Sequence, residues 1–159
     1  MKKVLVSYFS ASGITADLAN RLAQTIGADT FEIRPQKPYS TADLDWTNKM
    51  SRSSVEMRDP DCRPPLAKAI PDLTNYQVVF VGFPVWWYRE PSIIDTFMEK
   101  GNFEGQTVVP FATSGGSGLG DSMQNMQRLA PQAVVKNGQR FSANVSAQEL
   151  AAWAKQFIN

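Results

Sequence analysis

The chain has 159 residues, with 16 lysines and arginines against 15 aspartates and glutamates, so its formal net charge is +1. This length suits one domain that buries roughly 70% of its unfolded surface, and the balanced charge does not favour a nucleic-acid partner. There is no histidine and one cysteine, Cys62. These absences exclude an internal disulfide, a histidine-ligated or cysteine-rich metal site, and a Ser-His-Asp or Cys-His pair. Demanding chemistry would therefore belong to a bound organic cofactor.

The chain opens with a strand, a tight turn and a helix. Residues 2–9 form an apolar, β-branched run that is typical of a buried strand. The next six residues, Ser-Ala-Ser-Gly-Ile-Thr at 10–15, are rich in hydroxyl groups. Apolar residues then recur every four positions from Ile14 to Ile26, which predicts an amphipathic helix with these side chains facing inward.

The turn between that strand and that helix is a candidate anion site. Backbone amides at a helix start point outward at the positive end of the helix dipole, where a phosphate would fit. Gly13 lets the backbone come close, and Ser10, Ser12 and Thr15 offer hydroxyl groups. Because no lysine or arginine occurs between positions 3 and 21, we expect the anion to be held without a counter-charge. Capping of the helix by Ser12 is the alternative interpretation, and both stay open.

The part of the chain that follows is the least regular. Residues 30–33 predict a short second strand. Six prolines then interrupt residues 34–73. A helix is expected within 41–57, where Trp46 and Met50 lie four positions apart and would bring one face to the core.

The second half alternates strands and helices. The most apolar run, 78–83, predicts a central parallel strand that is covered on both faces. It leads through Pro84 into Val-Trp-Trp-Tyr at 85–88, and a helix is expected at 92–100. Residues 107–113 predict the fourth strand.

A glycine-rich turn at 114–120 and a helix at 121–129 follow. The fifth strand is expected at 133–135 and resumes at 140–142, because Asn-Gly between them is a turn signal. A capping box at 146–149 starts the last helix.

Five strands alternating with five helices predict one α/β domain over residues 1–159, a three-layer sandwich on a five-stranded parallel sheet. In such sheets, ligands bind beyond the carboxyl ends of the strands, where the strand order reverses. In the order 2-1-3-4-5, the loops after strands one, three and four lie side by side. These loops are residues 10–15, 84–88 and 113–120.

The glycine-rich turn matches neither of two common nucleotide motifs. Residues 115–120 have the spacing of a P-loop, but Asp121 stands where that motif needs lysine. The dinucleotide fingerprint fails at the same residue. Bare backbone amides are better suited to the polar edge of a heterocycle.

The aromatic residues of the second loop favour a flat ligand. Trp86, Trp87 and Tyr88 stand at a strand end, where they are better placed to flank a ring than to fill the core, although ordinary packing is the alternative. A phosphate cradle, a stacking surface and ring-edge amides together predict a planar heterocycle that carries a phosphate.

The three loops resemble those of the flavodoxin family, and the resemblance extends over nearly the whole chain. Residues 10–15 are similar to the family's phosphate loop, T/S-x-T/S-G-x-T, and 84–87 and 113–118 resemble the two flavin-ring loops of flavodoxin-type oxidoreductases. The resemblance implies a flavodoxin-like fold and FMN as cofactor. It implies that the phosphate is held by Ser10, Ser12, Gly13, Ile14 and Thr15, that one side of the isoalloxazine is lined by Pro84, Val85, Trp86, Trp87 and Tyr88, and that its edge meets Thr113, Ser114, Gly115, Gly116 and Gly118.

Two departures from the family's electron carriers bear on activity. Those carriers are typically strongly acidic, whereas this chain is nearly neutral. The glycine loop also lacks the aromatic residue that covers the second ring face in many carriers, so this face is open unless Trp46 or Tyr39 covers it. An open face suits hydride transfer from a nicotinamide or to a quinone-like acceptor.

The resemblance therefore implies an FMN-binding redox protein, first of all a small NAD(P)H-dependent reductase of quinone-like acceptors. A one-electron carrier with a redox partner protein is the second possibility. A non-redox module that binds a phosphorylated ligand or a partner protein is the third. No acid–base residue and no metal site are expected. The opening run is too short for a signal peptide and no segment approaches the roughly 20 apolar residues of a membrane span, so a cytoplasmic location is expected.

Overall fold

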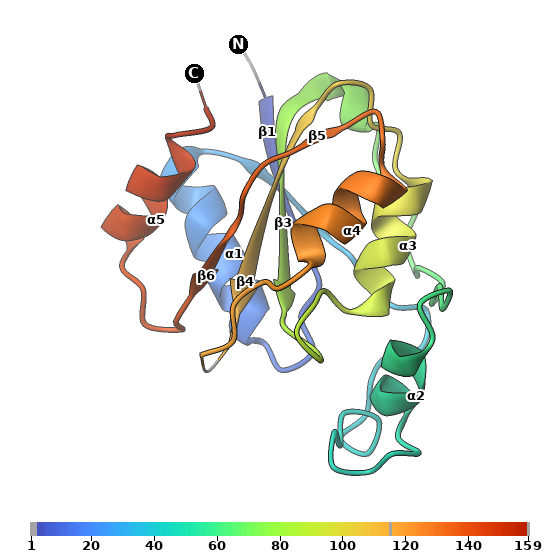
Figure 1. The fold of residues 1–159 in the computed structure, drawn as a ribbon. Coiled ribbons are helices and arrows are strands. Elements are labelled where there is room, and N and C mark those ends of the chain that lie inside the picture. Colours follow the sequence, from blue (N-terminus) through green and yellow to red (C-terminus); the bar gives the residue numbers. More distant parts are fainter. Residues whose placement is uncertain (1–2, 115, 159) are drawn as a thin grey trace.

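A parallel sheet forms the centre of the computed structural model, which describes residues 3–114 and 116–158 (Figure 1). Its strand order is β2-β1-β3-β4-β5, and β6 also pairs with β4. The predicted order is confirmed, and the expected fifth strand consists of two short pieces. The strands are β1 (Lys3–Tyr8), β2 (Asp29–Glu32), β3 (Tyr76–Pro84), β4 (Thr107–Thr113), β5 (Val134–Val135) and β6 (Gln139–Phe141).

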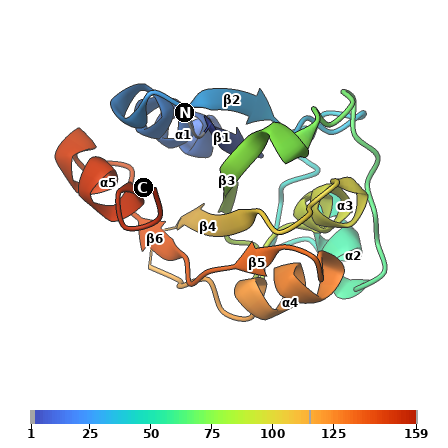
Figure 2. The same ribbon diagram turned by 90° about the horizontal axis from the view of Figure 1, so that it is seen from above.

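Helices cover both faces of the sheet (Figure 2). They are α1 (Ile14–Ile26), α2 (Arg52–Arg58), α3 (Ser92–Lys100), α4 (Ser122–Leu129) and α5 (Ala147–Ala154). Helices α1 and α5 lie on one face, and α3 and α4 lie on the other. The capping box predicted for the last helix is seen in part, since the Ser146 hydroxyl oxygen accepts a hydrogen bond from the Glu149 amide at 3.1 Å.

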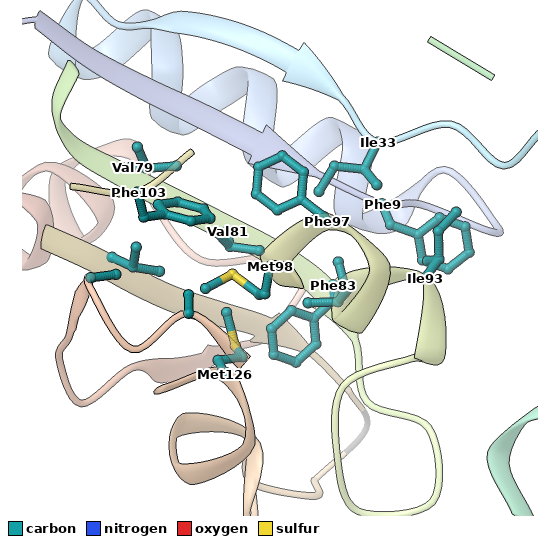
Figure 3. Packing of buried hydrophobic residues seen from close by; sticks show 14 of the residues in the cluster. Phe9, Ile33, Val79, Val81, Phe83, Ile93, Phe97, Met98, Phe103 and Met126 are labelled. Carbon is teal, nitrogen blue, oxygen red and sulfur yellow. The ribbon is translucent and has the colours of Figure 1, made fainter. Parts of the chain in front are cut away.

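Each face of the sheet buries its own apolar cluster. Under α1 and α5, Leu18 and Leu22 pack near Phe80 and Phe111. On the other face, the phenylalanine and methionine side chains of β3, α3 and α4 interdigitate (Figure 3). Because β3 is apolar on both faces and lies between β1 and β4, the sheet holds the ends of these three strands in fixed positions.

The irregular segment, residues 33–72, differs from its prediction. The helix expected within 41–57 forms only as α2. Trp46 and Met50 are 75% and 78% exposed, so the prediction that they reach the core is wrong. The physical reason lies in the turns before α2. There the Asp45 and Asn48 side chains accept hydrogen bonds from backbone amides two residues further on, which competes with a helix.

Candidate functional site

The loops after β1, β3 and β4 meet at the carboxyl edge of the sheet, at the lower side of Figure 1. Ser12, Val85 and Ser114, one residue from each loop, line one hollow of about 530 Å³. The predicted convergence of the three loops is therefore seen in the structure.

This first hollow, the polar hollow, adjoins a second one of about 490 Å³, the aromatic hollow. Four residues line both: Ser12, Pro84, Val85 and Trp86. The polar hollow adds Ile14, Thr113, Ser114, Arg140, Ser142 and Ala143. The aromatic hollow adds Ala11, Leu44, Trp46, Ser53, Trp87, Tyr88 and Ser117. The two hollows thus share one wall. Hydroxyl groups and a cation line the polar hollow, and aromatic rings line the aromatic hollow.

The start of α1 has the backbone that the anion hypothesis needs. Gly13 is the N-cap at φ +94°, a left-handed conformation that favours glycine. Since no side chain caps α1 in this described stretch, the alternative that Ser12 caps the helix is wrong. Ser12 is exposed and lines both hollows. Ile14 was expected to face inward, but as the first helical residue it sits at the rim and is 49% exposed.

Two of the predicted phosphate contacts, Ser10 and Thr15, make hydrogen bonds within the protein. The Ser10 hydroxyl oxygen accepts a hydrogen bond from the Gly13 amide at 3.1 Å. The Thr15 and Thr113 hydroxyls are buried and lie 2.7 Å apart, which links the start of α1 to the end of β4. Among these residues, only Thr113 belongs to a hollow lining in the described chain.

The aromatic loop is a tight two-residue turn. The Trp86 amide donates to the Arg89 carbonyl at 3.0 Å, and the Arg89 amide donates to the Trp86 carbonyl at 3.1 Å. Trp87 and Tyr88 between them have φ values of +48° and +65°, which are strained for bulky residues. A side chain at Gly120 would lie 2.1 Å from the Tyr88 carbonyl oxygen, so glycine is needed there for the turn to approach.

The three aromatic residues of this turn have different surroundings. Trp86 packs edge-on against Phe9 and Tyr39, with ring centroids 5.5 and 5.4 Å away, so ordinary packing explains part of its position. Trp87 and Tyr88 are 42% and 77% exposed and line the aromatic hollow. These two rings are therefore displayed at the hollow and contribute little to the core.

The irregular segment also contributes to the lining of the aromatic hollow. Leu44, Trp46 and Ser53 belong to its lining. Trp46 was considered from sequence as a ring cover, whereas Leu44 and Ser53 carried no sequence signal. The Ser53 hydroxyl is buried and has no hydrogen-bond partner within residues 3–114 and 116–158. Tyr39, the other residue considered as a cover, lies behind Trp86.

Arg140 on β6 brings a positive charge to the polar hollow. Its Nε and Nη2 atoms donate to the Ser114 hydroxyl at 3.1 Å and the Ser114 carbonyl at 3.0 Å. The expectation of an anion site without a nearby cation is wrong, since Arg140 shares this lining with Ser12 and Ile14. The pairing of β6 with β4 places this residue beside the end of β4, so no local sequence pattern could reveal its place in the hollow.

A sequence model of the family described as Flavodoxin matches residues 3–157. The chain belongs to the flavodoxin family. It is 43% identical to a candidate flavoprotein from Bacteroides eggerthii, with a TM-score of 0.92 and coverage of 100% of this chain and 99% of that one. It is 42% identical to a candidate flavoprotein from Bacteroides uniformis, with a TM-score of 0.91 and coverage of 97% of this chain and 98% of that one.

A more distant structure shows the same fold. It is a Lactobacillus acidophilus flavoprotein in complex with FMN, which is 21% identical with a TM-score of 0.69 and coverage of 97% of this chain and 99% of that one. No curated protein sequence matches the chain.

The glycine loop of this flavodoxin-family protein is only partly in contact with the hollows. Gly115 lies outside the described residues. Gly116 and Gly118 are exposed and, so far as the structure describes the chain, lie outside both linings. Ser114 and Ser117 line the polar and aromatic hollows respectively, and the Ser114 hydroxyl donates to the Ser117 carbonyl at 2.5 Å.

A cluster of three ionisable residues, Arg89, Glu90 and Asp95, adjoins the aromatic turn of this family member. Glu90 follows the turn directly and is fully buried. Arg89 Nη1 donates to Asp95 at 3.1 Å and to the Glu90 carbonyl at 3.0 Å. Burial, together with the neighbouring Asp95 carboxyl, raises the pKa of Glu90 to about 9. This raised pKa favours the protonated, uncharged form of Glu90.

Two negative findings apply to the described residues, 3–114 and 116–158. No group of three or more metal-ligating side chains (His, Cys, Asp or Glu) occurs among them. None of their helices has the length and apolar character needed to cross a bilayer.

Proposed function

We propose that this flavodoxin-family protein binds FMN across the two adjoining hollows and transfers electrons or hydride through it. The observation that carries the proposal is the shared wall of Ser12, Pro84, Val85 and Trp86, which joins the polar hollow to the aromatic hollow. FMN has this combination, a phosphate at one end and a flat ring at the other.

The polar hollow fits the phosphate end. Gly13 turns the chain into α1 with no side chain over the first amides, and these amides have no intrahelical acceptors. Backbone donors and the helix dipole at such a place favour an anion. The exposed Ser12 hydroxyl is available beside them.

The aromatic hollow fits the ring end. Its volume of about 490 Å³ lies within the range of small-molecule sites. Trp86 and Trp87 line it from the aromatic turn, and Trp46 lines it from the irregular segment. Bound there, FMN would supply the redox chemistry, while the protein orients the ring, excludes water and stacks aromatic side chains beside it.

The first candidate activity is reduction of quinone-like acceptors by NAD(P)H. No formally charged side chain lines the aromatic hollow among the described residues, so an uncharged planar acceptor is favoured there. The net reaction would move one hydride from NAD(P)H and one proton from solvent to the quinone, which leaves as the hydroquinone.

A one-electron carrier is the second candidate, and one observation favours it. Trp46 is 75% exposed and lines the aromatic hollow, where its side chain would restrict direct contact between the flavin ring and a hydride donor. Electron transfer to a redox partner protein does not need such contact.

The visible absorption spectrum of the purified protein tests FMN binding first. We expect a yellow protein whose flavin bands are released on denaturation. Oxidation of NADH or NADPH by a quinone, measured next, would support the reductase. No oxidation of either nicotinamide, with two separated one-electron waves in a redox titration, would support the carrier. A colourless protein that takes up no FMN would contradict both and favour a non-redox module for phosphorylated ligands.

A further inference from the structure

Arg140 holds an unusual position among the arginines of this chain. Five arginines are partly buried, and four of them have a carboxylate within 4.0 Å: Arg21, Arg52, Arg63 and Arg89. Arg140 has no such carboxylate within residues 3–114 and 116–158. A partly desolvated cation without an anion is costly, so its persistence at a hollow indicates an anionic ligand.

The guanidinium of Arg140 is held in place by the glycine loop. Its Nε and Nη2 atoms both donate to Ser114, at 3.1 and 3.0 Å. The planar group is thereby oriented before any ligand arrives, and charge-assisted hydrogen bonds from such a group to phosphate are among the stronger ones.

The surrounding loop is fixed as well. Arg21 on α1 donates to the Val145 carbonyl at 2.6 Å and the Ala143 carbonyl at 2.9 Å. Since Ala143 lines the polar hollow, these bonds tie its far wall to the same helix whose first turn faces the hollow.

We propose that Arg140 is the counter-charge for the FMN phosphate and selects phosphorylated flavin over riboflavin, an inference that rests on the function proposed above. Arg140 lines the polar hollow together with Ser12 and Ile14, and it is absent from the lining of the aromatic hollow. The charge therefore lies at the phosphate end of the site, while its bonds to Ser114 link that end to the loop beside the ring.

Paired titrations with FMN and riboflavin test this inference, with flavin fluorescence as the readout. In the wild type we expect FMN to bind much more tightly than riboflavin. Loss of one charge-assisted contact in Arg140→Gln should weaken FMN about 10- to 100-fold and leave riboflavin nearly unchanged. Raising the salt concentration should weaken FMN binding more in the wild type than in Arg140→Gln.

Two further variants serve as controls. Arg140→Lys keeps the charge and should retain most of the preference for FMN. Arg128→Gln removes an exposed charge on α4 and should bind both flavins like the wild type. Urea unfolding of each variant checks that it is folded. If Arg140→Gln does not fold, Arg140→Lys is the deciding variant. Loss of its preference for FMN at low salt concentration would contradict the proposal.

The outcomes separate this inference from the proposed function. If Arg140→Gln binds FMN and riboflavin more weakly by the same factor, the charge acts at the ring and the proposal is wrong. Unchanged affinity for both flavins would also overturn it. A wild-type protein that binds neither flavin would instead contradict the proposed function itself.

Discussion

The two hollows share a wall, yet they are built from different kinds of structure. The polar hollow is lined by residues in or just after β3, β4 and β6 and by residues at the start of α1. Much of the aromatic hollow comes from the irregular segment and from a strained turn, residues 86–89. In the proposed site, the sheet would fix the recognition of charge, whereas the surroundings of the ring would depend on local side-chain contacts.

The supports of the two hollows differ in the same way. Behind the polar hollow, the Thr15 and Thr113 hydroxyls join two elements of the sandwich. Next to the aromatic hollow, Arg89 at the end of the turn donates to Asp95 at 3.1 Å and lies 3.7 Å from a Glu90 carboxyl oxygen. In this cluster, side-chain atoms of all three residues are buried and lack hydrogen-bond partners within the described chain, which makes it sensitive to pH.

The largest expected effect comes from a negative charge at the wall that both hollows share. Ser12→Asp should weaken FMN binding by at least about 100-fold, since like charges at a binding interface cost several kcal/mol. Titration calorimetry measures the loss. The uncharged Ser12→Asn should retain most of the affinity, and equal losses in both variants would show that shape, and not charge, decides binding at Ser12.

The next effect concerns stability and pH. Because the folded-state pKa of Glu90 is raised to about 9, folded Glu90 retains its proton between about pH 5 and 9 while unfolded Glu90 loses it. Wild-type stability should therefore fall as the pH rises through this window. Glu90→Gln should remove this decline and be more stable at pH 8 by about 1–3 kcal/mol.

Urea unfolding at pH 5 and pH 8 measures that difference. Glu104→Gln, at an exposed position, should behave like the wild type. A decline of the same size in Glu90→Gln and the wild type would show that Glu90 does not carry it.

Trp46 and Met50 form a matched pair in the irregular segment. They are similarly exposed, at 75% and 78%, but only Trp46 lines the aromatic hollow. Trp46→Ala should weaken FMN binding about tenfold through lost stacking and leave unfolding within about 0.5 kcal/mol of the wild type. Met50→Ala should change neither, and a matching loss of affinity in it would mean that the whole segment, and not the ring of Trp46, matters.

The smallest effect is expected in the aromatic turn itself. Tyr88→Gly relieves a residue at φ +65°, so the midpoint of thermal unfolding should rise by about 1–3 °C, while flavin binding weakens slightly. Tyr88→Ala removes the ring and keeps the strain, so its midpoint should not rise. If the unfolding midpoint rises in both variants, the exposed ring, and not the backbone conformation, is what destabilises the wild type.

Sequence patterns predicted the alternation of strands and helices and the turn before α1, because these depend on local period and on one glycine, Gly13. They failed for Met50, because side chains such as Asp45 and Asn48 bond to nearby backbone and prevent the expected helix. Arg140 and Ser53 were missed for another reason: each reaches the site through tertiary packing, and neither has a motif around it.

A crystal structure of the protein with FMN tests the central claim most directly. We expect one FMN, with its phosphate between the start of α1 and Arg140 and its ring against the aromatic turn. A flavin bound elsewhere, or a phosphate remote from Ser12, would contradict it.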